Sequence, residues 1–493
     1  MSTCKSLGSI LEDGADAAPQ NTAIICGAAA ISYAELDRTT TALARWLLQQ
    51  GLRTGDRVAI HWANSVEIVT LCFACFKAGV IAVPVNIRLK PAEVEYVLRH
   101  SEASICFSQP YLAHIAEQAI AAGNLAIPLR SDLPRETDLA GVLPEVIPTD
   151  PCIILYTSGT TAHPKGAIHT HASLFHSGRM TLLLFDGPGT VAMATTQVSH
   201  MSGICALMAC LLNRRTVLLL PAFEPALALD SIERFRVNHV VSLPLMLELM
   251  VVEQAQRPRD VSSLQNLSCG GDSLPVPLQQ RLEDTFGVPV IEVIGMTESC
   301  PAIWNTAQFN RAGSVGKTGA DVKIEGNYGN DGVGEMLVRS PANFIGYWRD
   351  TEATVLALRD GWLHTGDLVR QDSDGYLWFS GRLKQIIIRG GSNIAPQEVE
   401  EVLYAHPSVL QACAVGVPHP LFGQGVAAYV ALKETATAST QELRDFARER
   451  LADYKLPENI WFLPELPRGL TGKIDRRALA ERALRDIQGH LVT

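Results

Sequence analysis

The chain has 493 residues, of which 47% are hydrophobic and 19% charged, and its formal net charge is −10. This length predicts two or three domains with large cores, and the acidic balance argues against a nucleic-acid-binding protein, which normally carries a basic excess. The N-terminal stretch MSTCKSLGSILEDGADAAPQ has acidic residues where a signal peptide needs an apolar core, and no run approaches about 18 apolar residues. We therefore expect a cytoplasmic protein that does not insert into membranes.

Strand-like and helix-like segments alternate from the N-terminus to about Pro301. Apolar runs such as RVAIHWA, CIILYTS, TVLLLP and HVVSLP are typical of strands. The segment ELDRTTTALARWLLQQG has apolar residues at helical spacing and a glycine stop at Gly51. Cys72 and Cys75 form one C-x-x-C without a second pair or a nearby histidine, so we interpret them as buried helix residues. The alternation predicts parallel sheets covered by helices.

The pattern changes after this point. From about Pro301 to Ser380, glycine and aspartate turns separate short strands such as GEMLVRS and GYLWFSG, which predicts a small antiparallel or β-barrel-like subdomain. Further on, PQEVEEVLYAHP is a predicted helix with a proline in its first turn, and STQELRDFARERLADY opens with a Ser439–Glu442 capping box. We expect a separate small α+β unit beyond a junction near Gly381–Gln385.

The stretch YTSGTTAHPKG is a candidate phosphate-binding loop. It is not a Walker A loop, because Gly159 is followed by Thr-Thr-Ala-His-Pro before Lys165. Glycine allows close backbone approach, consecutive N–H groups can form an anion-binding concavity, and Lys165 adds a mobile positive charge. The alternative is a solvated polar turn, but a long run of small hydroxyl residues and glycine favours binding of an anion.

Later segments offer polar groups that are weak signals one by one. VIGMTES ends a strand-like run with Thr297 and Glu298, and a carboxylate there is a natural Mg²⁺ ligand beside ATP. GWLHTGDL places Asp367 in a glycine-flanked turn, which suits either a turn former or a ribose-binding carboxylate. SGRLKQIIIRGGSN supplies Arg382 before a strand, and LPRGLTGKIDRRAL puts Lys473 in a loop before a basic helix. Their order and number make the combined signal strong.

In this order, the motifs YTSGTTAHPKG, GMTES, GWLHTGDL, GRLKQIIIRGG and LTGKIDRRAL resemble those of the ANL superfamily of adenylate-forming enzymes, which includes acyl- and aryl-CoA synthetases. The resemblance covers almost the whole chain. It implies a two-step reaction, in which a carboxylate attacks the α-phosphate of Mg-ATP to give acyl-AMP and pyrophosphate. The thiol of CoA then takes the acyl group and releases AMP.

The resemblance also implies a domain organisation. We expect an α/β fold with a large N-terminal AMP-binding domain of two helix-covered, parallel-type sheets plus a small β-barrel-like subdomain (residues 1–381). A hinge (382–385) and a small mobile α+β C-terminal domain (386–493) would follow, and the C-terminal domain would rotate between the two steps. The expected cofactors are ATP, Mg²⁺ and CoA, the partner is a small-molecule carboxylic acid, and the chain would be a monomer or homodimer.

Matched by position, the resemblance assigns a role to each site residue. The nucleotide would be bound by Thr157, Ser158, Gly159, Thr160, Thr161 and Lys165 at the β- and γ-phosphates, by Gly271, Asp272 and Ser273 along the adenine, by Asp367 and Arg382 at the ribose, and by Ile294, Gly295, Met296 and Phe379 elsewhere in the site. The expected catalytic residues are Thr297 at the α-phosphate, Glu298 as a Mg²⁺ ligand with Thr161, Lys384 at the hinge, Lys473 in the C-terminal domain and His200 as a gate. Gly390 and Gly391 would border the pantetheine tunnel, and the acyl pocket would contain Ser202, Gly203, Ala206, Cys300 and Ala302.

Three positions depart from the family pattern. Ala162 stands where the first motif has glycine, so a positive φ there would strain the loop. Ile294 replaces the aromatic residue that precedes GMTE, which removes ring stacking on the adenine, a contribution of about 1 kcal/mol. The stretch TTQVS before His200 stands where relatives have a proline and bulky apolar residues.

Two alternatives and the identity of the acid stay open. A ligase that passes acyl-AMP to a carrier protein is one alternative, although we find neither an insertion near the junction nor an acyl-site aspartate for a substrate ammonium group. A binding protein that keeps the fold without catalysis is the other, and Ala162 and Ile294 give it some support. The expected acyl-pocket residues are small or apolar and include no Arg or Lys, so we expect a medium-chain fatty acid or an aromatic acid rather than a dicarboxylic acid.

Overall fold

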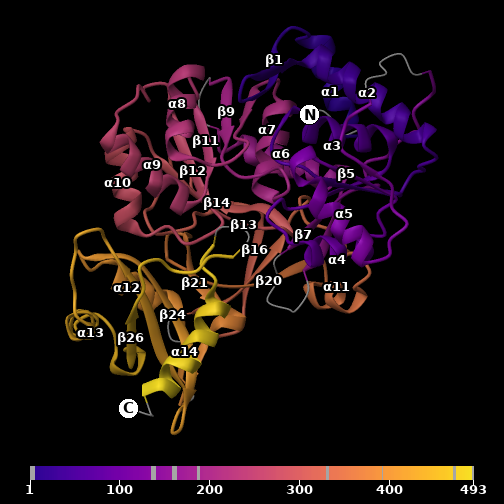
Figure 1. Ribbon diagram of the computed structural model, residues 1–493. Helices are drawn as coiled ribbons and strands as arrows, with labels where there is room; N and C mark the ends of the chain where they lie inside the picture. Colours follow the sequence, from indigo (N-terminus) through magenta and orange to yellow (C-terminus); the bar gives the residue numbers. More distant parts are fainter. Residues whose placement is uncertain are drawn as a thin grey trace.

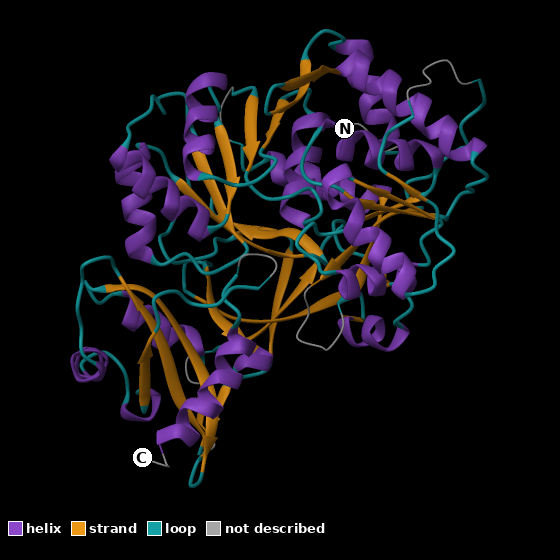
Figure 2. Cartoon of the chain, in the orientation of Figure 1, coloured by secondary structure: helices purple, strands orange, loops and turns teal. Residues whose placement is uncertain are grey.

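The computed structural model describes residues 6–134, 140–157, 164–185, 189–328, 332–390, 392–469 and 473–490 (Figure 1). Two large sheets and their helices form the upper part of the molecule as drawn, and a smaller C-terminal unit lies below them (Figures 1 and 2). Among the described residues, no helix has both the length and the apolar character needed to cross a bilayer.

The first large sheet has nine strands in the order β15-β14-β13-β12-β11-β9-β10-β1-β2. Strands β1 and β9 to β13 run parallel, and the antiparallel strands β2, β14 and β15 lie toward the edges. Their bounds are β1 (Thr22–Cys26), β2 (Ala29–Ser32), β9 (Val191–Ala194), β10 (Thr216–Leu219), β11 (His239–Ser242), β12 (Asn266–Gly270), β13 (Val290–Met296), β14 (Ser299–Trp304) and β15 (Thr318–Gly319).

The second large sheet has seven strands in the order β18-β8-β7-β4-β3-β5-β6. Strands β3 to β7 are parallel, and β8 returns antiparallel to β7. Their bounds are β3 (Arg57–His61), β4 (Ile81–Pro84), β5 (Ile105–Ser108), β6 (Leu129–Arg130), β7 (Pro151–Thr157), β8 (Lys165–Thr170) and β18 (Gly346–Tyr347). The two sheets confirm the parallel architecture predicted from the alternating segments.

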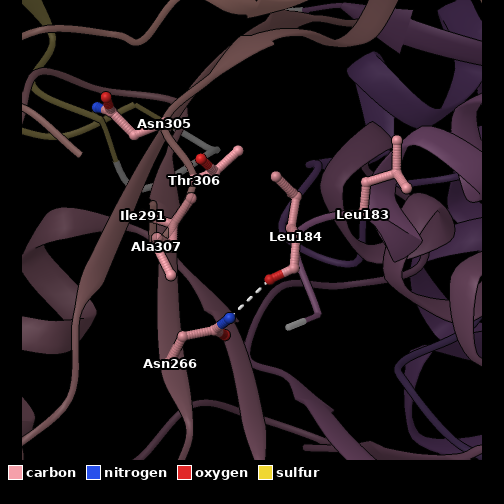
Figure 3. Close-up of a pocket in the computed structure, with 7 residues that line it drawn as sticks. All are labelled: Leu183, Leu184, Asn266, Ile291, Asn305, Thr306 and Ala307. Atoms are coloured by element: carbon pink, nitrogen blue, oxygen red, sulfur yellow. Dashed lines mark hydrogen bonds between the residues drawn. The ribbon is translucent and has the colours of Figure 1, made fainter. Parts of the chain in front are cut away.

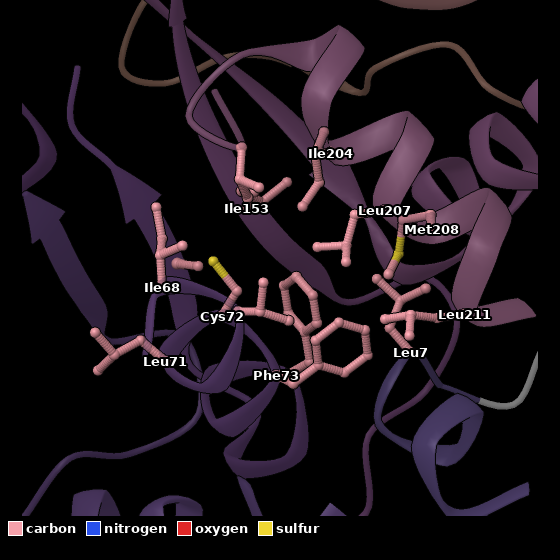
Figure 4. Close-up of a cluster of buried hydrophobic side chains, with 14 of the residues drawn as sticks. Leu7, Ile68, Leu71, Cys72, Phe73, Ile153, Ile204, Leu207, Met208 and Leu211 are labelled. Atoms are coloured by element: carbon pink, nitrogen blue, oxygen red, sulfur yellow. The ribbon is translucent and has the colours of Figure 1, made fainter. Parts of the chain in front are cut away.

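Helices cover both sheets, and one helical layer packs between them. The shared layer contains α1 (Gly8–Ala17), α2 (Tyr33–Gln49), α3 (Val66–Ala78), α6 (His171–Leu182) and α7 (Met201–Leu212), whose apolar side chains form the largest core (Figure 4). The outer face of the first sheet carries α8 (Pro225–Phe235), α9 (Pro244–Gln256) and α10 (Val276–Phe286), and that of the second carries α4 (Pro91–Ser101), α5 (Ala113–Ala122) and the short η1 (Pro110–Leu112). Cys72 and Cys75 are buried in α3, as predicted.

A smaller antiparallel sheet follows the large ones in sequence. It joins β16 (Asp321–Glu325), β17 (Gly334–Arg339), β19 (Leu358–Arg359), β20 (Trp362–Gln371) and β21 (Leu377–Arg382), with α11 (Thr351–Ala357) beside it. Its apolar face packs with Ala302 and Ile303 of β14, so the subdomain is fixed to the first large sheet. The antiparallel subdomain predicted from the glycine and aspartate turns is present.

The C-terminal unit has its own sheet, built from β22 (Ile387–Arg389), β23 (Ser392–Ile394), β24 (Val409–His419), β25 (Gly423–Leu432) and β26 (Asn459–Phe462). Helices α12 (Pro396–Tyr404) and α13 (Thr440–Arg448) cover one face, and α14 (Arg476–His490) covers the other. Short 3₁₀ turns η2 (Leu383–Gln385) and η3 (Asp453–Lys455) precede β22 and β26. The predicted capping box is formed, because Ser439 accepts from the backbone of Glu442 and Glu442 accepts from that of Ser439.

Candidate active site

The candidate site lies where strands of the two large sheets end. Parallel strands present their carboxyl ends at one edge of a sheet, which is where α/β proteins bind ligands. Strand β7 ends at Thr157, β12 ends just before Gly271, β13 ends just before Thr297, and β9 is followed by the loop that carries His200. The predicted residues in these segments therefore follow the carboxyl ends of strands from both large sheets.

Thr297 and Glu298 form a tight turn between β13 and β14, whose flanking residues Met296 and Ser299 are paired. The hydroxyl of Tyr347 donates to Glu298 Oε1 over 2.6 Å, and the N–H of Phe344 donates to the Glu298 carbonyl over 2.8 Å. Burial, followed by the charge of Glu298, raises the pKa of Tyr347, which keeps the phenol a neutral donor. The Glu298 carboxylate is thus held in one orientation.

Lys165 lies opposite Thr157 in the β7–β8 pair, so the loop between them starts and ends at the same place. Its ammonium is 3.8 Å from Asp350 Oδ2 and 5.0 Å from the ring centroid of Tyr347. Tyr347 therefore links Lys165 with Glu298. The predicted loop residues Ser158, Gly159, Thr160, Thr161 and Ala162 lie outside the described residues.

Asp367 and Arg382 face each other across β20 and β21, with the Arg382 Nε atom 2.9 Å from Asp367 Oδ1. Asp367 is buried, and burial raises the pKa of its carboxyl group, against the lowering effect of Arg382. The sequence predicted a turn here, but Asp367 lies within strand β20, at a register shift beside Gly366, whose φ is +70°. Phe379 is in β21 and packs against the core of the small sheet.

Lys473 reaches this cluster from the C-terminal unit. A Cβ atom at Gly271 would lie 3.9 Å from Lys473 Cε, which places the lysine stem against the segment after β12. Although the Lys473 residue as a whole is exposed, desolvation around its ammonium lowers the pKa of that group, and the carboxylates of Asp272 and Asp367 oppose the effect. A lysine of the C-terminal unit thus interacts electrostatically with carboxylates of the N-terminal part.

His200 precedes the first residue of α7 and interacts electrostatically with Lys473. Its Nε2 atom is 3.4 Å from the amide nitrogen of Asn86. Burial lowers the pKa of His200 to about 4, with further lowering by the charges of Lys473 and Arg88. His200 is therefore neutral near pH 7. Asn86 and Arg88 were not predicted as site residues, although their position just after the buried strand β4 is a usable signal.

The predicted acyl-pocket residues lie on two elements that meet beside His200. Ser202, Gly203 and Ala206 are in α7, and Cys300 and Ala302 are in β14. The two elements touch where Cys205 Sγ approaches the Cys300 carbonyl at 3.6 Å. Gly203 is sterically required, since a Cβ atom there would lie 2.2 Å from the carbonyl oxygen of Gln197.

Hydrogen bonds between described residues join the C-terminal unit to the N-terminal part at both ends of α12. Gln397 of α12 donates to Ser273 Oγ over 3.1 Å, next to the predicted adenine segment Gly271–Ser273. Tyr404, at the end of α12, donates to Glu248 Oε1 over 3.3 Å, and the same oxygen accepts from Arg281 over 2.7 Å. In the arrangement that these hydrogen bonds hold, Lys473 of the same C-terminal unit lies against Gly271.

The remaining predicted residues lie in the N-terminal part, at the junction, or in the C-terminal unit. Gly295 lies against Cys300, since a Cβ there would be 3.0 Å from Cys300 Sγ, and Ile294 and Met296 pack on the small-sheet core. Lys384 is exposed in η2, at the junction of the two parts. Gly390 has a φ of +56° and donates its N–H to the carbonyl of Phe422, so it packs within its own unit. Gly391 lies outside the described residues.

A small cavity elsewhere in the first sheet is unrelated to this site. Leu183, Leu184, Asn266, Ile291, Asn305, Thr306 and Ala307 line it (Figure 3). Its volume of about 20 Å³ is enough for roughly one water molecule. Asn266, which donates to the Leu184 carbonyl over 2.7 Å, begins β12, whereas the candidate site follows the other end of that strand.

The donor set suits a metal that arrives with a phosphate ligand. In the parts of the chain that the structure describes, no three His, Cys, Asp or Glu side chains gather as a metal-binding group. Mg²⁺ is commonly held by one or two carboxylates together with phosphate oxygens and water. The carboxylate of Glu298 is oriented by Tyr347, whose ring also lies near Lys165, and it fits that requirement.

Comparison with known proteins identifies the family. The family model described as AMP-binding enzyme matches residues 11–348, and that of its C-terminal domain matches residues 398–473. A feruloyl-CoA synthase from Amycolatopsis sp is 37% identical over 484 residues, covering 95% of this chain and 97% of that protein. A medium-chain fatty-acid–CoA ligase from Escherichia coli (strain K12) is 30% identical, covering 97% of this chain and 91% of that protein.

A solved structure resembles the whole molecule. The crystal structure of an anthranilate CoA ligase in complex with anthranoyl-AMP superimposes with a TM-score of 0.91 at 26% identity and covers 99% of both chains. The chain therefore belongs to the AMP-binding enzyme family of adenylate-forming proteins, within the branch of the acid–CoA ligases.

Proposed function

We propose that the protein is an AMP-forming ligase that joins an aromatic carboxylic acid to CoA. The main observation behind this proposal is that the charge of Lys473 acts on both Asp367 and His200. It supports a site in which a nucleotide and a carboxylate meet at one positive charge contributed by the C-terminal unit.

In the first step, a carboxylate oxygen attacks the α-phosphorus of ATP, and pyrophosphate leaves. Lys165 and the hydroxyl of Thr297 would bind phosphate oxygens, and Glu298 would hold the Mg²⁺ that accompanies the nucleotide. Asp367 would accept the ribose hydroxyls. Lys473 would counter the negative charge that builds up where the carboxylate meets the α-phosphate.

In the second step, the CoA thiol attacks the acyl carbon, loses its proton and displaces AMP. We infer that the C-terminal unit, taken as residues 386–493, moves relative to residues 1–381 through a hinge at 382–385. Lys384 is exposed at that junction, and the N–H of Gly390 is bound within the unit rather than to the site. A rotation would bring Gly390 and Gly391 toward the acyl-AMP while withdrawing Lys473.

The hydrogen bond of Tyr404 gives a test of this movement. Tyr404→Phe removes a contact to Glu248 that exists in the docked arrangement, worth about 1 kcal/mol or roughly fivefold in an equilibrium. We expect pyrophosphate exchange to fall by up to roughly fivefold, while conversion of supplied acyl-AMP to the thioester does not fall.

The matched control for that prediction is Tyr429→Phe. Tyr429 donates to Asp486 over 2.7 Å inside the C-terminal unit, so its loss does not touch the docking surface. If Tyr404→Phe slows both half-reactions equally, or neither, the docked arrangement has no special role in adenylation.

An aromatic acid is supported over a medium-chain fatty acid by the similarity pattern. Identity is higher to the feruloyl-CoA synthase, at 37%, than to the medium-chain ligase, at 30%, and the structural neighbour holds an aromatic acyl-adenylate. Transfer to a carrier protein is not favoured, because these relatives are CoA ligases. Arg88, exposed near His200, makes a dicarboxylic acid a necessary comparison.

A carboxylate panel tests the proposal. Ferulate, anthranilate, octanoate and a dicarboxylate are each incubated with Mg-ATP, and the adenylate is trapped with hydroxylamine. We expect aromatic acids to give the highest kcat/KM and CoA to replace hydroxylamine as acceptor. Preference for octanoate would overturn the aromatic assignment, and trapping without CoA-dependent turnover would favour a carrier-protein acceptor.

A further inference from the structure

We propose that His169 is a positioning residue that fixes the turn Thr297–Glu298 for adenylation, an inference that rests on the proposed function. His169 belongs to β8, where alternate side chains share a face, so it lies on the same face as Lys165. The imidazole is fully buried, and its Nε2 atom is 2.7 Å from the carbonyl oxygen of Thr297. Two residues of strand β8 thus serve the same region: His169 contacts the turn, and Lys165 lies near Tyr347.

The hydrogen-bonding pattern fixes the state of the ring. A carbonyl only accepts, so Nε2 carries the proton and donates to Thr297. Burial lowers the pKa of His169 to about 4, so the ring is neutral and Nδ1 is an acceptor. Nδ1 is 3.1 Å from Ser173 Oγ, whose one hydroxyl proton is shared between Nδ1 and the Thr170 carbonyl 3.2 Å away, and which accepts from the Thr170 N–H in the capping box that begins α6. Both ring nitrogens therefore have polar neighbours, and the bond of Nε2 to Thr297 is the shorter one.

Two other groups hold the neighbouring residue of the turn but do not hold Thr297. Phe344 donates to the Glu298 carbonyl, and Tyr347 donates to its carboxylate. Successive carbonyls of the turn are thus bound by different segments of the chain, and His169 binds the Thr297 carbonyl. Loss of that donor would leave a part-buried acceptor unpaired and free the peptide to rotate, displacing the hydroxyl assigned to the α-phosphate.

Two substitutions at His169 with amide side chains test whether the residue acts as a hydrogen-bond donor to Thr297 or only fills space in the core. The amide nitrogen of glutamine can reach the position of Nε2, whereas the shorter asparagine reaches that of Nδ1. H169Q therefore keeps a donor for Thr297, and H169N keeps a partner for Ser173 but loses the donor. We expect H169N to lower the adenylation kcat by roughly 10- to 100-fold, as small misplacements near a reacting centre do, and H169Q to restore most of it.

The readouts distinguish positioning from stability. In H169N, the Mg²⁺ concentration for half-maximal adenylation should rise, while conversion of supplied acyl-AMP to the thioester stays within about twofold. The control H239N replaces another fully buried histidine, at the start of β11, and should lower the melting temperature without changing the Mg²⁺ dependence. Equal losses in H169N and H169Q, or an unchanged Mg²⁺ dependence in H169N, would overturn the proposal.

A second measurement does not depend on ligase activity. The Phe344 amide is bonded to the turn, so its hydrogen exchange reports whether the turn has loosened. Faster exchange in the peptide containing Phe344 is expected in H169N and not in H169Q. Unchanged exchange in H169N would overturn the positioning role. If the wild-type protein forms no acyl-adenylate, the proposed function fails, but the exchange data still decide whether His169 fixes the turn.

Discussion

Lys473→Ala should lower carboxylate-dependent pyrophosphate exchange by about 10²–10³, the effect of removing one positioned group that stabilises developing charge. The lysine stem lies against Gly271, and its ammonium interacts with Asp272 and Asp367, so the substitution removes positive charge at the proposed reaction centre. Conversion of supplied acyl-AMP to the thioester should be unaffected, because Lys473 is proposed to leave the site before that step. Both half-reactions are measured on one preparation.

The control for this prediction is Lys323→Ala, which removes an exposed lysine paired with Glu325 in β16. The pH profile adds an independent check. Desolvation around its ammonium lowers the pKa of Lys473, even though the residue as a whole is exposed. The charged form, and with it adenylation, should therefore be lost at a lower pH than for an ordinary lysine. That alkaline limb should be missing in Lys473→Ala. Equal loss of both half-reactions would show that Lys473 has no step-specific role.

Glu298→Gln should lower adenylation by about 10² at limiting Mg²⁺, with partial recovery at high Mg²⁺, because the amide keeps the shape but loses the charge that holds the metal. The reaction is followed as pyrophosphate release over a Mg²⁺ titration. Tyr347→Phe provides a graded comparison, since it leaves the carboxylate but removes the hydroxyl 2.6 Å from Glu298 Oε1. Groups that orient a metal ligand typically change metal affinity by about 10- to 100-fold, so this variant should also need more Mg²⁺. An unchanged Mg²⁺ dependence in Glu298→Gln would remove Glu298 from the metal site.

Local pattern and motif order predicted much of the fold, because they depend on short segments. The apolar runs, the capping box at Ser439 and the buried helix with Cys72 are all encoded within a few residues, and each is present. The strand order was not predictable in this way. Strands β9 and β10 lie between β11 and β1 in the sheet, a pairing that depends on contacts between distant segments.

In the candidate site, too, short motifs were predictable from the sequence, whereas contacts between distant segments were not. Motifs led to Glu298, Asp367 and Lys473, and the structure brings their side chains into one electrostatic environment. Asp367 was expected in a turn because Gly366 precedes it, yet Asp367 pairs with Arg382 of β21, and the next residue, Leu368, pairs with Glu335 of β17. His169 gave no signal, since a single histidine in an apolar strand has the pattern of a core residue until its partner, Thr297, is known.

The fate of the carboxylate oxygens is the most direct test of the central claim. The protein is incubated with an aromatic acid labelled with ¹⁸O in its carboxylate, together with Mg-ATP and CoA, and the products are analysed by mass spectrometry. If the carboxylate attacks the α-phosphorus, each turnover transfers one ¹⁸O atom to AMP, and pyrophosphate stays unlabelled. Label in inorganic phosphate together with ADP, or thioester formation without labelled AMP, would contradict an acyl-adenylate route.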